Sequence, residues 1–442
     1  MRFTAADAAR ASGGTLVGPD VELVGASFDS RSVERGQMFV PVVADRDGHG
    51  FVADALARGA AAYLSSRGAT DGGTAIVVDD TVRALGAVAA WARGELDSRL
   101  GGRTVGITGS VGKTTTKELV AAALATTLRT AASPRSFNND QGLPVTILNA
   151  PDDVEAMVLE MGMRGFGEID RLCRVARPSV GVVTAVAEAH TGRVGGIDGV
   201  ARAKAEIVAA LPADGTAVLN GDDPRVAAMR VLAPCAVVSY GTGADADVRL
   251  VSRTVDDAGC ASMEVGTPWG PVAVRMGLPG LHMAHNALAA IAVAGVLGVP
   301  LDRAGAAIGS VEAPPMRMQV RRTPAGATVI DDCYNANPAS MQAALETLAA
   351  LGAHRRVLVA GEMAELEHPE VAHRAVAALA HRLGIELVAV GTDLYGAAAV
   401  GIERAVEVLA SLERGDAALV KGSRVARLER VVEGAATRPE DR

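Results

Sequence analysis

Residues Thr108–Thr115 read T-G-S-V-G-K-T-T, with glycines, one lysine and neighbouring hydroxyls in an order that suits phosphate binding. Backbone N–H groups of the Gly109–Gly112 turn, together with the positive end of a following helix, would hold phosphate oxygens. Lys113 would reach the β- and γ-phosphates, and the Thr114 hydroxyl would bind Mg²⁺. We therefore predict a nucleoside triphosphate site formed by Thr108, Gly109, Ser110, Val111, Gly112, Lys113, Thr114 and Thr115.

This loop departs from the strict phosphate-loop pattern, because Ile107 stands where that pattern has its first glycine. The alternative interpretation is an ordinary glycine-rich turn with a solvated lysine. It is disfavoured because the apolar run Val105–Ile107 precedes the loop and a helical pattern from Thr115 to Leu124 follows it.

Lysine is rare in this chain, since only four of the 43 basic residues are lysines. They are Lys113, Lys117, Lys204 and Lys421. Arginine stays protonated and has a bulky planar head, whereas lysine is a compact cation that can also act as a neutral amine. Each lysine is therefore a candidate site residue. The alternative is that a lysine remains at its position by chance and has no role at a site. Lys117 is the weakest candidate, because we expect it on the outward side of its helix.

Further polar residues follow apolar runs that read as strands of a mostly parallel sheet. Glu160 follows Ala156–Leu159, and His190 lies beyond Val180–Thr184. Ligands of such sheets bind at the carboxyl ends of the strands, so we expect these side chains at the site. His190 taken alone is also compatible with a core or surface histidine.

The composition describes a globular protein, with 49% hydrophobic and 21% charged residues. We find no apolar run long enough to cross a membrane and no signal peptide at the N-terminus. The net charge of −8 argues against a general nucleic-acid binder. The four widely spaced cysteines predict buried free thiols, and we expect a cytoplasmic protein.

Strands and helices alternate along the whole chain, which predicts an α/β fold of three domains. The expected boundaries are 1–97, 98–308 and 309–442. The first domain should contain strands at Val21–Phe28 and Gly36–Val42 and a helix at Phe51–Arg58. Its polar loops suit a ligand with a phosphate or sugar, and ordinary turn chemistry explains them equally well.

Several segments together resemble the ATP-dependent Mur ligases, in order along nearly the whole chain. Besides the phosphate loop, they are F-N-N-D-Q-G-L-P at Phe137–Pro144, L-E-M-G at Leu159–Gly162, Ala189-His190, the helix segment Gly199–Ile207, Gly280–Ala290, D-D-C-Y-N-A-N-P at Asp331–Pro338 and K-G-S-R at Lys421–Arg424. The string at Asp331–Pro338 resembles the members that add a D-alanyl-D-alanine dipeptide. Two residues depart from the family pattern, Met283 in place of asparagine and Arg202 in place of the first of two lysines.

The resemblance implies an N-terminal domain that binds a UDP-linked substrate, a central parallel-sheet domain like that of P-loop ATPases, and a Rossmann-like C-terminal domain that binds the incoming dipeptide. It implies a ligase that uses ATP and two Mg²⁺ ions to join D-alanyl-D-alanine to UDP-N-acetylmuramoyl-tripeptide through an acyl phosphate, as a monomer.

The site residues that the resemblance implies fall into four groups. The catalytic group is Lys113, Lys204, His190 and Arg317. The metal group is Thr114, Glu160, His190 and a carbamylated Lys204. Besides the loop, the ATP group holds Asn286 and Asp332. The substrate group is Ser30, Arg31, Asn138, Asn139, Tyr334, Asn335, Lys421, Ser423 and Arg424.

Three other interpretations are weighed against this one. A related ligase that adds a single amino acid is disfavoured by the Asp331–Pro338 string and by the lack of a D-N-P-R string. A nucleotide switch would turn over ATP without a UDP-linked peptide. A degenerate binding protein is disfavoured by intact Lys113, Thr114, Glu160 and Lys204.

Overall fold

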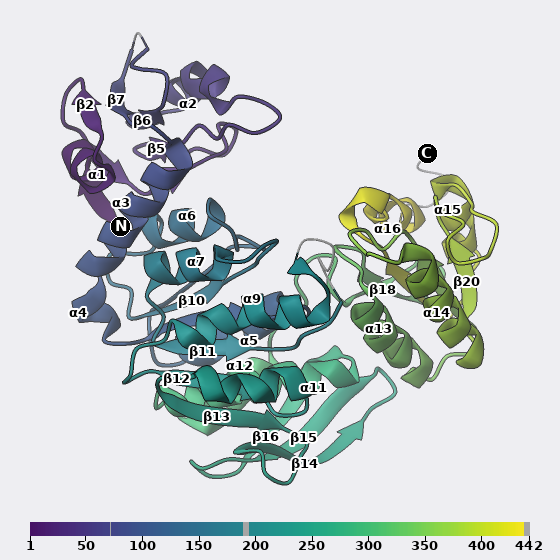
Figure 1. The fold of residues 1–442 in the computed structure, drawn as a ribbon. Helices are drawn as coiled ribbons and strands as arrows, with labels where there is room; N and C mark the ends of the chain where they lie inside the picture. Colours follow the sequence, from purple (N-terminus) through teal and green to yellow (C-terminus); the bar gives the residue numbers. More distant parts are fainter. Residues whose placement is uncertain (71, 189–193, 437–442) are drawn as a thin grey trace.

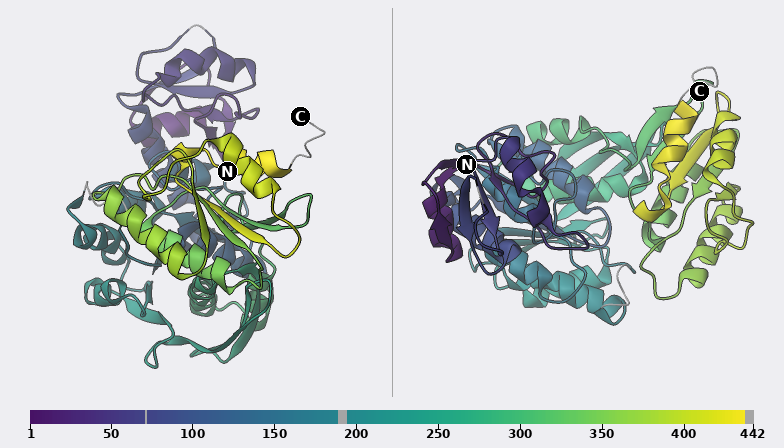
Figure 2. Two further views of the ribbon diagram at one scale, coloured as in Figure 1. Left: turned by 90° about the vertical axis from the view of Figure 1, so that its right-hand side faces the viewer. Right: turned by 90° about the horizontal axis from the view of Figure 1, so that it is seen from above.

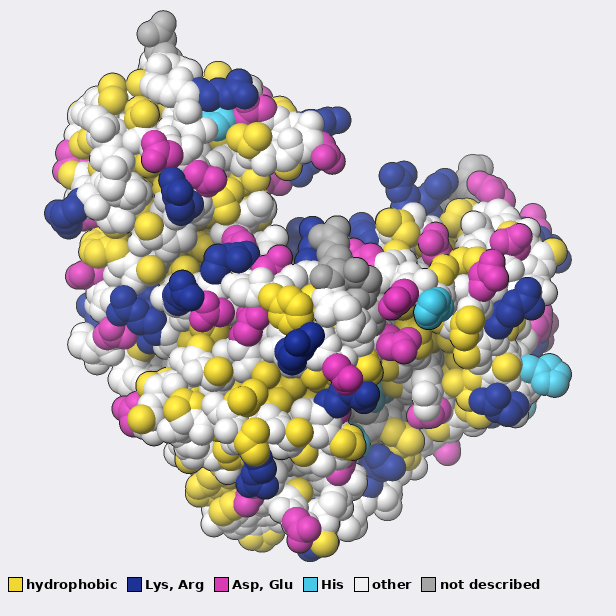
Figure 3. Space-filling view, viewed as in Figure 1, with side chains coloured by type: hydrophobic (Ala, Val, Ile, Leu, Met, Phe, Trp, Pro, Cys, Tyr) yellow, Lys and Arg dark blue, Asp and Glu magenta, His cyan; other side chains and the backbone are white. Residues whose placement is uncertain are grey.

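A computed structural model describes residues 1–70, 72–188 and 194–436 of the chain. Three α/β domains follow one another around a large open hollow (Figures 1 and 2). The N-terminal and C-terminal domains both rest on the central domain and face each other across that hollow, which the space-filling view also shows (Figure 3). The predicted α/β class with three domains is confirmed, while the predicted boundaries at 97/98 and 308/309 stay predictions.

The N-terminal domain is built on a five-stranded sheet of order β2-β7-β6-β5-β4. Its elements are β1 (Arg2–Thr4), α1 (Ala5–Ser12), β2 (Thr15–Val17), β3 (Glu22–Val24), β4 (Ala26–Ser27), β5 (Met38–Phe39), α2 (Val52–Ala57), β6 (Ala62–Ser65), β7 (Thr74–Val77), α3 (Thr81–Glu95) and α4 (Asp97–Leu100). The strand predicted at Val21–Phe28 is divided, because Gly25 between β3 and β4 has a left-handed φ of +85°. A Cβ atom there would lie 1.9 Å from Asn149 Oδ1, so glycine is required.

The central domain contains a nine-stranded sheet of order β16-β15-β14-β13-β12-β11-β8-β10-β9. The pairings from β9 to β14 are parallel, and those of β14 with β15 and of β15 with β16 are antiparallel. Its strands are β8 (Thr104–Thr108), β9 (Thr130–Ala132), β10 (Ala156–Glu160), β11 (Val180–Val183), β12 (Thr216–Asn220), β13 (Ala236–Gly241), β14 (Val248–Val255), β15 (Cys260–Gly266) and β16 (Val272–Pro279).

Helices cover both faces of this sheet, as a parallel sheet requires. One face carries α5 (Lys113–Ala125), α11 (Leu281–Val296) and α12 (Leu301–Gly309). The other face carries α6 (Gly142–Leu148), α7 (Glu168–Ala176), α9 (Ile197–Ala209) and α10 (Pro224–Ala227). Successive residues of β10 therefore enter different cores, with Val158 packed beneath α5 and Leu159 packed on the opposite side.

The C-terminal domain has a five-stranded sheet of order β17-β18-β21-β19-β20, parallel except for the edge strand β17. Its elements are β17 (Gln319–Arg322), β18 (Thr328–Asp332), α13 (Pro338–Ala350), β19 (Arg356–Ala360), α14 (Pro369–Arg382), β20 (Glu386–Ala389), α15 (Ile402–Ala410), β21 (Ala417–Lys421) and α16 (Glu429–Ala436). Pro338 is the first residue of α13, which Asn337 caps by accepting a hydrogen bond from the Ser340 N–H.

The cysteine prediction is only half right. All four cysteines are free, and Cys173 and Cys333 are buried, but Cys235 and Cys260 are only partly buried. The wide spacing of the cysteines argued against disulfides but did not show how deeply each thiol is buried. Burial depends on which face of a strand or loop is covered by other elements. In the part of the chain that the structure describes, no helix is long and apolar enough to cross a membrane.

Candidate active site

The predicted phosphate loop connects β8 to α5 and presents its backbone to a cavity of about 510 Å³. Gly109 has φ +152° and Gly112 has φ +83°, conformations that L side chains rarely adopt. A Cβ atom would lie 1.9 Å from Thr184 Oγ1 at Gly109 and 2.6 Å from Asn286 Oδ1 at Gly112. Both glycines are therefore needed by the loop's shape and by its neighbours.

Hydrogen bonds from the end of β11 hold the loop in place. The Ser110 N–H donates to the Ala185 carbonyl over 2.8 Å, and the Ser110 hydroxyl donates to the Ala187 carbonyl over 3.0 Å. Thr184 Oγ1 donates to the Val111 carbonyl over 2.6 Å. The loop is thus shaped by the segment that follows β11, and Gly109–Lys113 line the cavity.

Lys113 extends over the loop, and its ammonium donates to the Gly109 carbonyl over 2.7 Å. Burial lowers the pKa of Lys113; the carboxylate of Glu160 opposes this effect and the guanidinium of Arg317 adds to it. The ammonium therefore lies between the loop and a second cation, where an anion with several negative oxygens would be stabilised.

Glu160, at the end of β10, is 1% exposed and accepts two side-chain hydrogen bonds. Thr114 Oγ1 donates to its Oε2 over 2.8 Å, and Asn138 Nδ2 donates to its Oε1 over 2.8 Å. The Thr114 hydroxyl and the Glu160 carboxylate offer oxygen ligands of the kind that Mg²⁺ prefers. This ion is usually bound by one or two carboxylates together with substrate phosphates, and seldom by ligands from the protein alone. The described residues contain no cluster of three histidine, cysteine or acidic side chains that could hold a metal ion.

Lys204, on α9, is 4% exposed and lines the same cavity as Lys113 and Glu160. Its ammonium makes no hydrogen bond or ion pair with any residue that the structure describes. Burial lowers the pKa of Lys204 well below its usual value, and the nearby Lys113 lowers it further. A lysine in such surroundings holds a neutral amine more readily than one in water. His190, predicted to share a metal ion with it, lies outside the described residues.

Arg317 comes from the linker between the central and C-terminal domains and reaches the same cavity. Its guanidinium lies over the ring of Tyr334, 4.2 Å from the ring centroid, and donates to Ser136 Oγ over 3.0 Å. Besides Tyr334, the C-terminal domain contributes Asn335, Asn337 and Glu365 to the cavity lining. Arg317 therefore connects the central and C-terminal domains at the phosphate loop.

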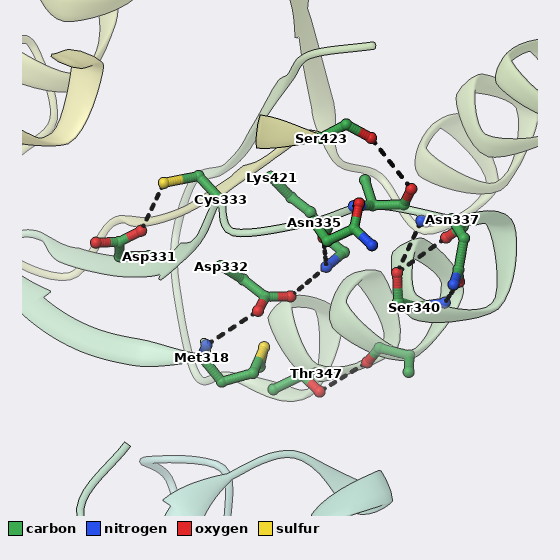
Figure 4. A network of polar contacts seen from close by, with 12 residues as sticks. Met318, Asp331, Asp332, Cys333, Asn335, Asn337, Ser340, Thr347, Lys421 and Ser423 are labelled. Atoms are coloured by element: carbon green, nitrogen blue, oxygen red, sulfur yellow. Dashed lines mark hydrogen bonds and ion pairs between the residues drawn. The ribbon is translucent and has the colours of Figure 1, made fainter. Parts of the chain in front are cut away.

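A second cavity of about 270 Å³ lies beside the first and is shared by the same two domains. Predicted residues that line it are Ser110, Val111, Gly112, Thr115, Asn286, Arg317, Asp332, Tyr334, Asn335 and Lys421. Lys421, which is 2% exposed, donates to Asp332 Oδ2 over 2.5 Å and to the Asn335 carbonyl over 3.0 Å (Figure 4). The other Asp332 oxygen accepts the Met318 N–H over 3.1 Å, so this network holds the linker against the sheet.

Some predicted residues do not reach these cavities. Asn138 and Asn139 line the first cavity, whereas Ser30 and Arg31 line neither. The Arg31 guanidinium instead holds Asp29, whose pKa it lowers to about 2. Ser423 accepts the Ala364 N–H over 2.9 Å within its own domain. Arg424 pairs with Glu429 over 3.1 Å and lines a third cavity, of about 1020 Å³, together with Thr114 of the central domain.

The prediction that Lys117 lies on the outward side of α5 is wrong. Lys117 is fully buried, and its ammonium donates to the Ser133 and Arg135 carbonyls. Helical periodicity could not show this, because the segment that covers this face of α5 follows β9, more than a dozen residues further along the chain. The scarcity of lysine was the sequence signal that pointed to Lys117.

Sequence reasoning also missed a histidine pair beside the second cavity. His285 lies 2.9 Å from Asp222 Oδ2, and His282 is partly buried, with burial lowering its pKa to about 4. Both belong to the segment Gly280–Ala290, in which only Asn286 was assigned. Their position on the first turns of α11, which faces the phosphate loop, was the available signal.

Comparisons with known proteins agree over most of the chain. A family model described as the Mur ligase middle domain matches residues 107–294, and one described as the Mur ligase, glutamate ligase domain matches residues 316–424. UDP-N-acetylmuramoyl-tripeptide–D-alanyl-D-alanine ligase from Bacillus subtilis (strain 168) is 37% identical over 364 residues, which cover 80% of this chain and 77% of that relative.

Solved structures extend the likeness to all three domains. A crystal structure of MurF from Acinetobacter baumannii superposes with a TM-score of 0.89 at 30% identity and covers 99% of both chains. MurF ligase from Thermotoga maritima in complex with ADP superposes with a TM-score of 0.80 at 28% identity, covering 93% of this chain and 97% of that one.

Proposed function

This chain belongs to the Mur ligase family, and we propose that it uses ATP to join D-alanyl-D-alanine to UDP-N-acetylmuramoyl-tripeptide. One observation carries the proposal. The cavity of about 510 Å³ brings Lys113, Thr114 and Glu160 of the central domain together with Tyr334 and Asn335 of the C-terminal domain. The ADP in the Thermotoga maritima relative and the name of the Bacillus subtilis relative support the nucleotide and the substrates.

The chemical difficulty is that a carboxylate is a poor acyl donor at neutral pH. Transfer of the γ-phosphoryl group from ATP to the tripeptide carboxylate gives an acyl phosphate and ADP. The amine of D-alanyl-D-alanine then attacks the carbonyl carbon and loses a proton, and the tetrahedral intermediate expels phosphate. Catalysis of phosphoryl transfer rests on positioning and on neutralising charge at the phosphoryl oxygens.

The residues around the loop suit that task. Lys113 and the N–H groups of Gly109–Gly112 would hold the β- and γ-phosphates. Thr114 and Glu160 would hold a Mg²⁺ ion, which neutralises charge on the phosphate oxygens when bound. Arg317 carries a permanent positive charge at the domain junction, where it would stabilise the transferring phosphoryl group.

Lys204 would contribute through a carbamate formed from its neutral amine and carbon dioxide, with release of a proton. Its lowered pKa supports this role, because the protonated amine cannot react. Together with His190, the carbamate oxygens would hold a second Mg²⁺ near the tripeptide carboxylate. Asn286 and Asp332 would contact the adenosine part of ATP, beside the cavity of about 270 Å³.

The remaining substrate roles complete the proposal. Ser30 and Arg31 would contact the uridine diphosphate, Asn138 and Asn139 the muramyl peptide, and Lys421, Ser423 and Arg424 the dipeptide side. Because residues from three domains would meet around the substrates, we expect the outer domains to close toward the loop when the substrates bind. The monomeric state, the cytoplasmic location and the lack of nucleic-acid binding stay predictions.

A product assay tests the proposal directly. Incubation of the chain with UDP-N-acetylmuramoyl-tripeptide, ATP, Mg²⁺ and D-alanyl-D-alanine should give the mass of the pentapeptide product and one ADP for each product formed. A single amino acid added in place of the dipeptide would support the related ligase, and ATP turnover that does not depend on the UDP-linked peptide would support a nucleotide switch.

A further inference from the structure

Lys117 is a fully buried cation that the proposed reaction does not use. Its ammonium donates to the Ser133 carbonyl over 2.6 Å and to the Arg135 carbonyl over 2.9 Å, and it lies 2.7 Å from Glu118 Oε1. An ammonium has three N–H donors, so all three have partners. A buried charge is retained at this depth only with such compensation.

The segment that Lys117 holds, residues 133–138, contacts two residues of the candidate active site. Ser133 Oγ accepts the Glu160 N–H over 3.1 Å, and Asn138 Nδ2 donates to Glu160 Oε1 over 2.8 Å. Ser136 Oγ accepts a hydrogen bond from Arg317 over 3.0 Å. The segment thus contacts both the carboxylate beside Thr114 and the arginine of the interdomain linker.

The backbone of this segment is strained at the residue that Lys117 contacts. Arg135 has a left-handed φ of +51°, a conformation that is unfavourable for a residue with a Cβ atom. The Arg135 carbonyl is one of the two that accept from Lys117. The ammonium therefore stabilises the backbone at the strained residue of the segment.

We propose that Lys117 is a positioning residue: through residues 133–138 it holds Glu160 for a divalent cation and Arg317 for the triphosphate. This inference rests on the proposed function of the same site. It also explains why a lysine is kept in an arginine-rich chain. A compact ammonium reaches two carbonyls and a carboxylate in different directions, whereas the planar fork of arginine directs its donors into one plane.

The test compares Lys117→Met with Arg93→Met, a matched loss of a buried cation. Arg93 is 3% exposed, donates to the Ala176 carbonyl over 2.9 Å and to the Arg177 carbonyl over 3.4 Å, pairs with Asp97 and lines none of the cavities described above. Both variants should lower the thermal unfolding temperature. Calorimetry should then measure binding of a non-hydrolysable ATP analogue while Mg²⁺ is titrated.

We expect Lys117→Met to raise the Mg²⁺ concentration for half-maximal analogue binding by about 10-fold or more, as loss of an outer contact to a metal ligand does. Arg93→Met should leave it unchanged, and both should bind the UDP-linked tripeptide as the parent chain does. Equal Mg²⁺ requirements in the two variants would overturn the proposal. Because the assay measures binding, it stays informative even if the unaltered chain forms no pentapeptide.

Ser133→Ala keeps the proposal testable if Lys117→Met does not fold. This variant leaves Lys117 and its two carbonyl partners in place and removes the Ser133 hydroxyl from the Glu160 N–H. It should raise the Mg²⁺ requirement by a smaller factor. If Lys117→Met folds, it can be combined with Ser133→Ala. The two increases in Mg²⁺ requirement should then be less than additive in the double variant, because both substitutions act through residues 133–138. An unchanged Mg²⁺ requirement in Ser133→Ala, or full additivity, would contradict the coupling.

Discussion

The N-terminal domain meets the central domain through α3, whose apolar face packs on α6 and α7, whereas the C-terminal domain meets it through residues 311–318 and α13. Both junctions contain a continuous apolar core. They differ in their polar groups. At the first junction, the Asn149 amide exchanges two hydrogen bonds of 2.9 Å with the backbone of Ala26, and neither Asn149 nor Ala26 lines a cavity described above.

At the second junction, the polar groups are those of the candidate active site. Arg317 contacts Ser136 across the junction, and Lys421 and Asp332 hold the linker at Met318. Met316 and Met318, on either side of Arg317, have left-handed φ values of +61° and +55°. Of the described residues that line the two cavities, Val82 alone comes from the N-terminal domain. The comparison indicates that the first junction serves domain packing, whereas the second junction also brings together the residues of the candidate active site.

The largest expected effect is at the second junction. Lys113→Ala should lower ATP turnover by about 10³-fold, because it removes the cation nearest the phosphates from a buried site. Binding of the UDP-linked tripeptide, measured by calorimetry, should stay within a factor of a few of the parent chain. If Lys113→Ala lost both ATP turnover and binding of the UDP-linked tripeptide, the separation of roles between the two junctions would be contradicted.

Lys204→Ala should lower the ligation rate by about 100-fold or more, because it removes the amine that would carry the carbamate. Short carboxylates such as acetate should restore part of the rate. In the unaltered chain, the neutral fraction of this amine rises as pH rises through a pKa that burial has lowered. Activation by bicarbonate should therefore begin at a lower pH than an ordinary lysine allows. A near-normal rate without rescue would exclude the carbamate.

His282 should make the second junction sensitive to acid. Its pKa is 6.5 in the unfolded chain and about 4 in the fold, where burial disfavours the charged ring. The unfolded state then binds more protons between these values, so the free energy of unfolding falls by about 3 kcal/mol as pH drops from 6.5 to 4. His282→Asn should flatten this part of the curve, measured by urea unfolding. A parallel decline in both proteins would assign the acid sensitivity to other groups.

The smallest effect on catalysis is expected at the first junction. Asn149→Ala removes both hydrogen bonds to Ala26 and should lower the free energy of unfolding by about 1–3 kcal/mol. The turnover number at saturating substrate should not change. A 10-fold loss of turnover with intact stability would mean that this junction also takes part in the chemistry.

The sequence predicted the strand, turn and helix around Lys113 correctly because the information for this geometry is local. A strand, two glycines in special conformations and a helix start lie within about 20 residues, so the spacing determines the geometry. The run predicted at Ala156–Leu159 became β10 for the same reason, since buried parallel strands read as apolar runs. The left-handed residues Arg135, Met316 and Met318 had no signal, because strain of this kind is set by neighbours from elsewhere in the chain.

The sequence by itself determined the α/β class, the phosphate loop, the acid at the end of β10 and the few lysines that arginine had not replaced. Only the tertiary structure decided that Lys117 lies inside, that Arg317 reaches the loop from the linker, and that Ser30 and Arg31 lie apart from both cavities. The physical reason is how far apart in the sequence the interacting residues lie. A hydrophobic pattern and a turn are read from neighbouring residues, whereas burial and a meeting of domains depend on chain segments that fold back from far away.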